Sequence, residues 1–159
     1  MQDRQVNTLA EINDFFSHQR LALVGVSRDE KGFGRQLMRE LARRGFDILP
    51  VNPAMSEVDG RRCFKSLMEI DPPPEAAMLM TGADHLPQLA KECALTGVRF
   101  AWVLRSGGDR TIRSNAIRIL RENLITTIDG LCPYMFLPES GMPHSLHRRI
   151  VRLFGRYPH

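Results

Sequence analysis

Short runs of apolar residues alternate along the chain with longer runs in which apolar residues recur every three or four positions. The short runs predict buried strands, and the longer runs predict amphipathic helices. Alternation of this kind is typical of a parallel sheet covered by helices on both faces. The sequence therefore predicts an α/β fold: a single Rossmann-like, three-layer domain with a five-stranded, mostly parallel sheet. The predicted strands cover 21–26, 46–51, 75–80, 98–104 and 124–128, and the predicted helices cover 9–18, 37–45, 86–97 and 109–123.

Capping signals mark the ends of the predicted helices. Thr8 and Glu11 have the spacing of a capping box before the first helix. Gly45 and Gly97 follow the second and third helices, where glycine commonly ends a helix. Asp109 is placed to cap the fourth helix. Between the second and third strands, we predict a polar connection over 54–62, a short helical turn over 64–70 and an extended, proline-rich loop over 71–74.

The loop after the first predicted strand carries the clearest sign of a ligand. It has the pattern G-x-S-x(6)-G from Gly25 to Gly34, in the order strand, loop and helix expected of a phosphate-binding crossover. Glycines let the backbone approach a diphosphate, and a hydroxyl and cations can bind its oxygens. The alternative is a tight turn that carries solvated charges. The candidate residues of this loop are Gly25, Val26, Ser27, Arg28, Lys31, Gly34 and Arg35.

The ends of the second and third strands narrow the choice of nucleotide. NAD-binding proteins place Asp or Glu after the second strand, where it binds the ribose hydroxyls, but this chain has Asn52 and Pro53. The glycine pattern also departs from G-x-G-x-x-G, so a standard nicotinamide site is disfavoured. Asn52 and Pro53 could instead be a simple turn. Thr81 and Gly82, after the third strand, either close over the ligand or only end the strand.

Length and charge limit what this loop can belong to. A chain of 159 residues fits one domain over 1–159, with a core over about 15–138 and a basic helix over about 143–155. No apolar run is long enough to cross a membrane and no signal-peptide core is present, so we expect a cytoplasmic protein. The net charge of +4 suits an anionic partner. Nucleic acid is disfavoured as that partner, because aromatic stacking motifs and recognition-helix patterns are missing.

Groups that could carry out catalysis are sparse in the sequence. Cys63, Cys93 and Cys132 are odd in number and far apart, which fits neither a disulfide framework nor a zinc site. His144 and His147 lie three residues apart without further metal ligands nearby. The sequence contains no nucleophile elbow, no P-loop lysine and no paired carboxylates on one element. We therefore expect no catalytic residue and no metal ion, and we predict that the chain is not an enzyme by itself.

A set of short motifs recurs in a characteristic order and spacing. They comprise 24–28, 33–34, 45–46, 50–53, 60–63, Trp102 and 129–133. In this order they resemble the CoA-binding domain family, whose Rossmann-like domain also opens the alpha subunit of succinyl-CoA synthetase. The resemblance covers about 15–138. It departs at Arg105, where stand-alone members often have a Gln-Pro-Gly type sequence, and at Leu131, where ligase-related members often have Asn.

The resemblance implies that the ligand is CoA or an acyl-CoA. Asn52 and Pro53 would then border the adenosine, and the cations of the glycine-rich loop would face the phosphates, including the extra ribose phosphate of CoA. Cys132 either faces the sulfur end of the ligand or is a buried structural thiol. The predicted function is non-catalytic binding of CoA or an acyl-CoA, in company with a partner protein or as a homo-oligomer. The alternatives are a small NAD(P)-binding oxidoreductase and a nucleotide-sensing regulatory protein.

Overall fold

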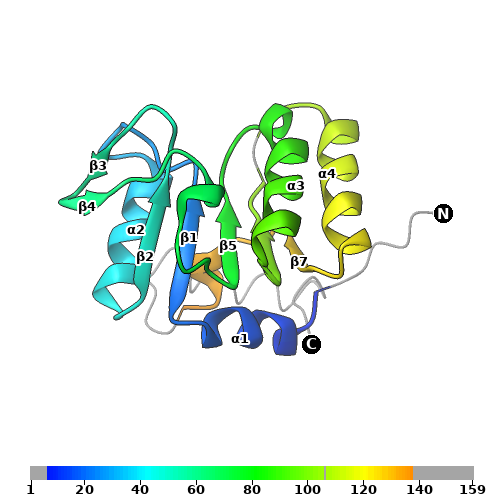
Figure 1. Cartoon of the computed structure of the whole chain (residues 1–159). Coiled ribbons are helices and arrows are strands. Elements are labelled where there is room, and N and C mark those ends of the chain that lie inside the picture. The colour runs from blue at the N-terminus through cyan, green and yellow to red at the C-terminus, as the bar shows by residue number, and fades with distance from the viewer. Residues whose placement is uncertain (1–6, 106, 138–159) are drawn as a thin grey trace.

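Helices and strands alternate through most of the chain in the computed structural model, which describes residues 7–105 and 107–137 (Figure 1). The α-helices are α1 (Leu9–Ser17), α2 (Phe33–Arg43), α3 (Leu86–Thr96) and α4 (Arg110–Glu122). The strands are β1 (Arg20–Val24), β2 (Asp47–Val51), β3 (Glu57–Val58), β4 (Arg61–Arg62), β5 (Ala76–Leu79), β6 (Phe100–Val103) and β7 (Thr126–Asp129). Short 3-10 helices are η1 (Leu67–Glu69), η2 (Ala83–His85) and η3 (Pro133–Met135). The predicted basic helix over 143–155 lies outside the described residues.

Five of the strands form one parallel sheet in the order β2-β1-β5-β6-β7. The order reverses between β1 and β5, because the chain first moves from β1 outward to β2 and then continues on the other side of β1. Leu23 of β1 accordingly lies between Pro50 of β2 and Met78 of β5. The predicted α/β fold with a five-stranded parallel sheet is confirmed. The carboxyl ends of all five strands lie along one edge of the sheet, which we call the carboxyl edge (Figure 1).

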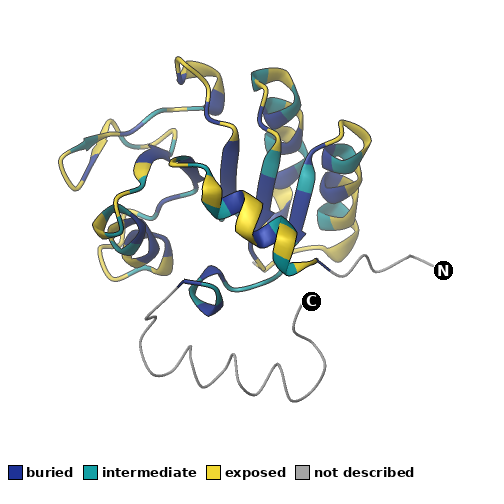
Figure 2. Cartoon of the chain, turned by 90° about the horizontal axis from the view of Figure 1, so that it is seen from below, coloured by how far each residue is buried: buried dark blue, intermediate teal, exposed yellow. Residues whose placement is uncertain are grey.

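The sheet is buried on both faces, and each face has its own hydrophobic core. Successive side chains of a strand point to opposite faces. Leu21 and Leu23 therefore pack in the core that includes α1 and α2, whereas Ala22 and Val24 pack in the core that includes α3 and α4. Figure 2 shows strands that are almost wholly buried beside helices that alternate between buried and exposed residues. This arrangement produces three layers.

Trp102 of β6 connects one core to the carboxyl edge. Its indole is fully buried, with ring centroids 5.3 Å from those of Phe15 and Phe16 and 6.0 Å from that of Phe136. The indole Nε1 donates a hydrogen bond of 2.8 Å to the carbonyl oxygen of Leu131. A buried tryptophan needs such an acceptor for its N–H group. The packing of the core thus fixes the segment that follows β7.

The predicted helix ends are confirmed. Thr8 and Glu11 form a reciprocal capping box at the start of α1. The Asp109 carboxylate accepts a hydrogen bond from the backbone amide of Thr111 at the start of α4. Gly97 ends α3 with a φ of 84°. All of the described helices are too short or too polar to cross a membrane.

The predicted polar connection over 54–62 is wrong in part, because it contains the β-hairpin of β3 and β4. Its two turn residues, Asp59 and Gly60, have φ values of 48° and 73°. Positive φ at both central residues is the requirement of a type I′ turn, for which Asp-Gly is a preferred sequence. The hairpin lies beside α2 and β2 in Figure 1. It therefore brings Asp59 close to the loop that connects β1 to α2.

Candidate functional site

Loops from neighbouring strands meet at the carboxyl edge where the strand order reverses. The amide of Gly25, after β1, donates a 2.9 Å hydrogen bond to the carbonyl oxygen of Val51 in β2. A Cβ added to Gly25 would lie 2.8 Å from Cγ2 of Thr81, after β5. Gly25 also has a φ of +92°, so both its conformation and the approach of the neighbouring loop require glycine. Proteins with open α/β sheets bind ligands at such switch points.

The loops after β5 and β6 are also in contact. The amide of Ala83 donates to the carbonyl oxygen of Gly107 at 3.3 Å. A Cβ added to Gly108 would lie 2.8 Å from Cβ of Ala83. By contrast, a Cβ added to Gly82 or Gly107 would have no neighbour within 4 Å among the described residues. The carboxyl edge is therefore a row of packed loops with open space beside two of its glycines.

The β1–α2 loop folds back over its own serine. Ser27 Oγ accepts a hydrogen bond from the amide of Asp29 at 3.0 Å, and the Asp29 carboxylate accepts one from the amide of Lys31 at 2.9 Å. A Cβ added to Gly32 would lie 3.1 Å from Cβ of Ser27. These contacts fix the loop. The hydroxyl proton of Ser27 can still be donated to a ligand, because the oxygen acts as the acceptor in this bond.

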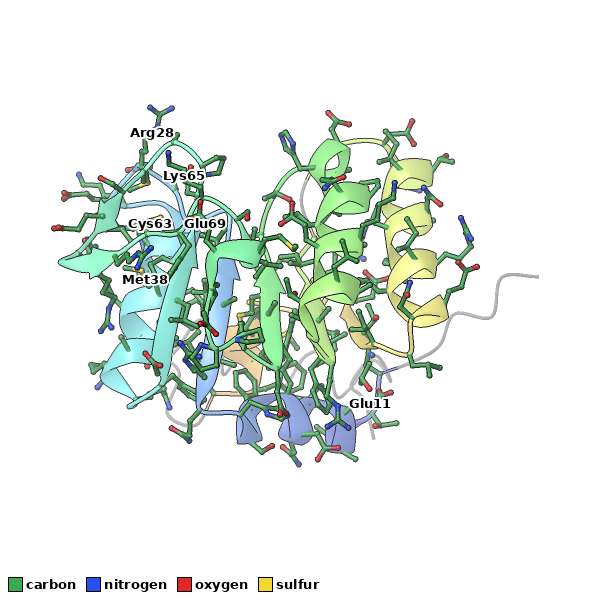
Figure 3. All side chains as sticks on the ribbon, in the orientation of Figure 1. Glu11, Arg28, Met38, Cys63, Lys65 and Glu69 are labelled. Atoms are coloured by element: carbon green, nitrogen blue, oxygen red, sulfur yellow. The ribbon has the colours of Figure 1, made fainter. Side chains whose placement is uncertain are left out.

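The start of α2 offers positive charge to a ligand. No side chain in the described chain caps this helix, and its first turn contains no acidic residue. Arg28 and Lys31 are exposed and form no ion pair with a described residue. Figure 3 shows the side chain of Arg28 pointing away from the ribbon at this edge. Backbone N–H groups at a helix start and nearby cations together attract anions.

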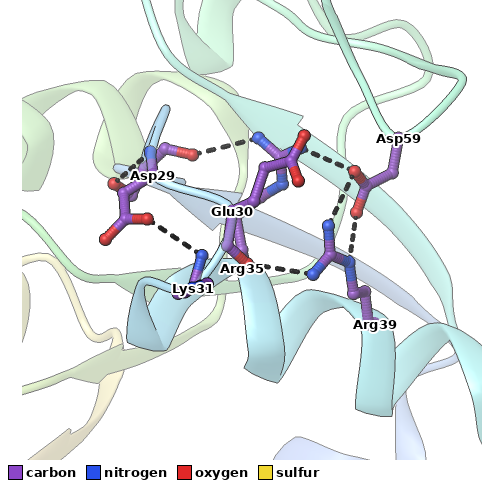
Figure 4. Close-up of polar contacts among 7 residues, drawn as sticks. Asp29, Glu30, Lys31, Arg35, Arg39 and Asp59 are labelled. Atoms are coloured by element: carbon purple, nitrogen blue, oxygen red, sulfur yellow. Dashed lines mark hydrogen bonds and ion pairs between the residues drawn. The ribbon is translucent and has the colours of Figure 1, made fainter.

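The third predicted phosphate-binding cation, Arg35, has a different environment. Its side chain is only 7% exposed, and its Nη2 lies 2.6 Å from the carboxylate of Asp59. Its Nη1 donates to the carbonyl oxygen of Ser27 at 3.2 Å. Arg39, one turn later, binds the same carboxylate at 2.7 Å and also the carbonyl oxygen of Glu30 (Figure 4). Arg35 thus braces the loop against the hairpin, and much of its charge is already balanced.

Asp59 is a site residue that the sequence reasoning missed. It lies between two guanidinium groups, and the hydrogen bonds from Arg39 and Arg35 lower the pKa of its carboxyl to about 2. The signal that could have found it is the Asp-Gly pair at 59–60, which predicts a two-residue hairpin turn. The pairing with α2 had no such local signal, because the partners are 24 residues apart for Arg35 and 20 for Arg39.

Asn52 joins the loops after β1 and β2. Its Nδ2 donates a 2.8 Å hydrogen bond to the carbonyl oxygen of the buried Val26, and its Oδ1 accepts one of 2.8 Å from the amide of Ala54. Pro53 is exposed beside it. The side chain at the end of β2 therefore holds the β1–α2 loop in place and is an amide, not a carboxylate.

Gly34 allows α2 to pack closely on the sheet. A Cβ added there would lie 3.3 Å from Cε of Met80 and 3.7 Å from the carbonyl oxygen of Gly25. The last glycine of dinucleotide-binding motifs has this same packing role. That Gly34 also lets a ligand approach the backbone stays a prediction. A bulky residue at this position would displace Met80, so it cannot serve as a clean test of that role.

The segment after β7 returns to the start of α2. The ring of Tyr134 packs edge-on against that of Phe33, with centroids 5.7 Å apart. Burial raises the pKa of Tyr134 to about 12. Cys132, two residues earlier, is half-buried, and burial raises the pKa of its thiol above the ordinary value. The structure thus places Cys132 beside the carboxyl end of β7 as a neutral thiol.

Comparison with known proteins identifies this arrangement. A family model described as a CoA-binding domain matches residues 19–138, which is most of the chain. The chain belongs to the CoA-binding domain family. The predicted resemblance is therefore confirmed, and the match includes every predicted site residue from Gly25 to Cys132.

Curated relatives of this CoA-binding domain include proteins of very different length. The uncharacterized protein YneT of Bacillus subtilis is 28% identical over 124 residues, which are 77% of this chain and 89% of YneT. The acetate–CoA ligase (ADP-forming) II of Archaeoglobus fulgidus is 28% identical over 102 residues, which are 63% of this chain and 15% of the ligase. The chain therefore spans only a small part of the ligase's length.

Solved structures share the fold. A hypothetical protein from Pyrococcus horikoshii has a TM-score of 0.74 at 21% identity, with 95% of this chain and 97% of that one covered. A conserved hypothetical protein from Pyrococcus furiosus has a TM-score of 0.62 at 27% identity, with 71% and 94% covered. The Rossmann-like architecture of the CoA-binding domain is thus common to both.

Proposed function

We propose that this CoA-binding domain binds CoA or an acyl-CoA, with the phosphates at the β1–α2 loop, and is not catalytic by itself. The observation that carries the placement is the start of α2, where a helix without a side-chain cap meets two exposed cations, Arg28 and Lys31. Phosphate oxygens can accept hydrogen bonds from the helix N–H groups and from both cations. Family membership supports the class of ligand.

The loop is held in shape before a ligand arrives. Arg35 fixes the carbonyl of Ser27, and Asn52 fixes the carbonyl of Val26, the residue before it. A ligand therefore does not have to order this backbone, and less binding free energy is lost to conformational entropy. This supports a site built for a diphosphate in one fixed position.

CoA fits this site better than a nicotinamide dinucleotide. NAD sites use a carboxylate after the second strand to bind ribose hydroxyls. Here that position is Asn52, whose amide is already bonded to the loop. CoA instead carries an additional phosphate on its ribose, and Arg28 or Lys31 is available to bind it.

The environments of the thiols support a binding role rather than catalysis. Burial raises the pKa of Cys63 and Cys132, and that of Cys93 to about 12, so each favours the thiol over the nucleophilic thiolate. Across 7–105 and 107–137 no three His, Cys, Asp or Glu side chains are grouped to hold a metal ion. In our proposal any chemistry on the bound thioester comes from a partner protein.

The proposal is tested by calorimetric titration of the full chain with CoA, dephospho-CoA and NAD. Lys31→Glu reverses a charge at the proposed site, and Lys91→Glu makes the same change on the exposed surface of α3. Loss of a charge-assisted hydrogen bond is worth about 1.5–3 kcal/mol, so we expect Lys31→Glu to weaken CoA binding by at least about tenfold. Lys91→Glu should bind CoA like the unaltered protein.

Three outcomes separate the parts of this proposal. Failure of the unaltered protein to bind CoA, or tighter binding of NAD, would overturn the proposed ligand. Equal loss of affinity in both lysine variants would show a general effect of net charge and overturn the placement. Equal binding of CoA and dephospho-CoA at low salt would show that the ribose phosphate is not recognised.

A further inference from the structure

A second group of cations lies at the carboxyl ends of β6 and β7, away from the proposed phosphate site. It consists of Arg105, two residues after the end of β6, and Arg113, the fourth residue of α4. A Cβ added to Gly130, directly after β7, would lie 3.7 Å from Nε of Arg105 and 3.8 Å from Nη2 of Arg113. The two guanidinium groups therefore stand together over Gly130.

The guanidinium of Arg113 is bonded to other groups of the protein. Its Nη1 donates to the carbonyl oxygen of Leu104 at 2.7 Å, and its Nη2 donates to that of Val103 at 3.0 Å. The same Nη2 is paired with the carboxylate of Asp129, and the Arg113 side chain is only 15% exposed. Arg113 thus ties the ends of β6 and β7 together and uses the carboxylate of Asp129.

Arg105 is available to a ligand. It is exposed and forms no hydrogen bond or ion pair with any described residue. Because the Asp129 carboxylate is held by Arg113, the charge of Arg105 has no counterion beside it among the described residues. Gly130 has a φ of +73°, and the Arg105 guanidinium packs at van der Waals distance over its backbone, while the space beside Gly107, two residues after Arg105, is open among the described residues. A guanidinium in this setting is suited to bidentate binding of a carboxylate.

The distance from the phosphate site fits the length of a CoA molecule. Along the carboxyl edge, β5, β6 and β7 follow β1 in order. At a strand spacing of about 4.8 Å, the ends of β6 and β7 lie roughly 10–15 Å from the end of β1. The open space beside Gly82, after β5, lies between them. We take the pantetheine arm to leave the phosphates on this side, which directs its end toward Arg105.

We propose that Arg105 binds the acyl end of the ligand and that the protein selects acyl-CoA thioesters whose acyl chain ends in a carboxylate. This inference rests on the proposed function, because it takes the phosphates of CoA to lie at the β1–α2 loop. The ligand class is then a dicarboxylic monothioester of CoA. Arg105 is a residue that determines specificity, and it takes no part in a chemical step.

The test compares thioesters that differ mainly in terminal charge. Affinities are measured for CoA and for two pairs, malonyl-CoA with butyryl-CoA and glutaryl-CoA with hexanoyl-CoA. Arg105→Gln removes the charge, and Arg99→Gln makes the same change at the opposite end of β6, where the residue is also exposed. We expect the unaltered protein and Arg99→Gln to prefer the charged member of at least one pair by about tenfold or more. Arg105→Gln should lose this preference and bind CoA unchanged.

The possible results distinguish failure of the inference about Arg105 from failure of the proposed CoA binding. If the unaltered protein binds CoA but does not distinguish the members of either pair, the inference about Arg105 is overturned and the proposed function stands. If Arg105→Gln weakens binding of CoA as much as that of the charged thioesters, Arg105 binds a phosphate and the inference is again overturned. If no CoA compound binds, the proposed function itself has failed and the inference falls with it.

Discussion

Both ends of the carboxyl edge carry exposed cations, but they are supported differently. Arg28 and Lys31 at the β1–β2 end lie on a loop held by bonds from two other elements, whereas Arg105 at the β6–β7 end lies beside Arg113, without such support among the described residues. At the first end, Arg35 and Arg39 share the carboxylate of Asp59, and Asn52 is bonded to the β1–α2 loop. At the second end, Arg113 is bonded to two backbone carbonyls and to Asp129, but Arg105 forms no hydrogen bond or ion pair with a described residue. The two ends are built from the same kinds of residue, so residue type alone does not decide which cation a ligand can reach.

This difference fits the two halves of the proposed ligand. The nucleotide half of CoA is the same in every thioester, and a fixed site binds a constant group with less loss of conformational entropy. The acyl half varies, and its recognition requires a group that is not already bonded within the protein. The contrast predicts large stability effects at the first end and effects on ligand choice at the second.

The largest expected effect comes from Gly25→Ala. Its φ of +92° strains any other residue, and a Cβ there would lie 2.8 Å from Thr81 Cγ2 and 3.2 Å from backbone atoms of residues 80 and 81. Gly45→Ala is a matched control, because Gly45 has a φ of +91° and no atom within 4 Å of the added Cβ. Backbone strain costs about 1–3 kcal/mol in both, and overpacking adds about 1–3 kcal/mol in Gly25→Ala alone. Urea unfolding measures the difference.

Equal loss of stability in the two alanine variants would contradict the comparison. It would mean that the loops after β1 and β5 move apart at little cost, so the β1–β2 end is not rigid. A larger loss in Gly25→Ala, with reduced affinity for CoA, would show that close packing of these loops shapes the phosphate site.

Arg35→Met should have the next largest effect. It removes the buried partner of Asp59 and the bond to the Ser27 carbonyl, while Arg39 remains on the carboxylate. Because Asp59 keeps one partner, we expect a loss of about 1–3 kcal/mol rather than the full cost of an unpaired buried charge. Arg43→Met is the control on the same helix: its side chain is 71% exposed, and its pair with Glu40 is worth less than about 1 kcal/mol.

Similar unfolding free energies for Arg35→Met and Arg43→Met would show that the buried pair adds nothing to stability. The brace would then matter only for the shape of the loop. In that case Arg35→Met should still weaken CoA binding, which the titrations used for Lys31→Glu would detect.

The sequence was sufficient for features set by local patterns. Strands, helices and the caps at Thr8, Asp109 and Gly97 follow from hydrophobic spacing and from short capping motifs, and the structure confirms them. The parallel sheet followed from the alternation of strands and helices. The hairpin at 57–62 was missed although its Asp-Gly turn is visible in the sequence.

The roles of the individual cations could not be read in the same way. Arg28, Lys31 and Arg35 all lie near the glycines, and only packing distinguishes the buried Arg35 from the two exposed side chains. The sequence did contain one indication that Arg35 is buried. Arg35 lies three residues before Met38, within the buried stripe of α2. Its partner Asp59 comes from a separate hairpin, and such distant pairing depends on the whole fold.

The smallest expected effect is on the pH dependence of stability. The carboxyl of Asp59 has a pKa of about 2 in the folded protein and an ordinary value of 3.8. Because the folded value is the lower one, the charged carboxylate stabilises the fold above about pH 5, and this contribution is lost as the pH falls toward about 2. Asp59→Asn lacks this contribution. Its stability should therefore fall less steeply than that of the unaltered protein over this range.

Asp14→Asn, an exposed position on α1, is the control for removal of one carboxylate, and the fluorescence of Trp102, the single tryptophan, reports unfolding. The stability difference between Asp59→Asn and the unaltered protein should shrink as the pH falls from 5 to 2, whereas that of Asp14→Asn should change less. Parallel stability curves for all three proteins would mean that the two arginines do not hold Asp59 ionised. The hairpin would then be a weak brace, and the two ends of the carboxyl edge would differ less than their hydrogen bonds indicate.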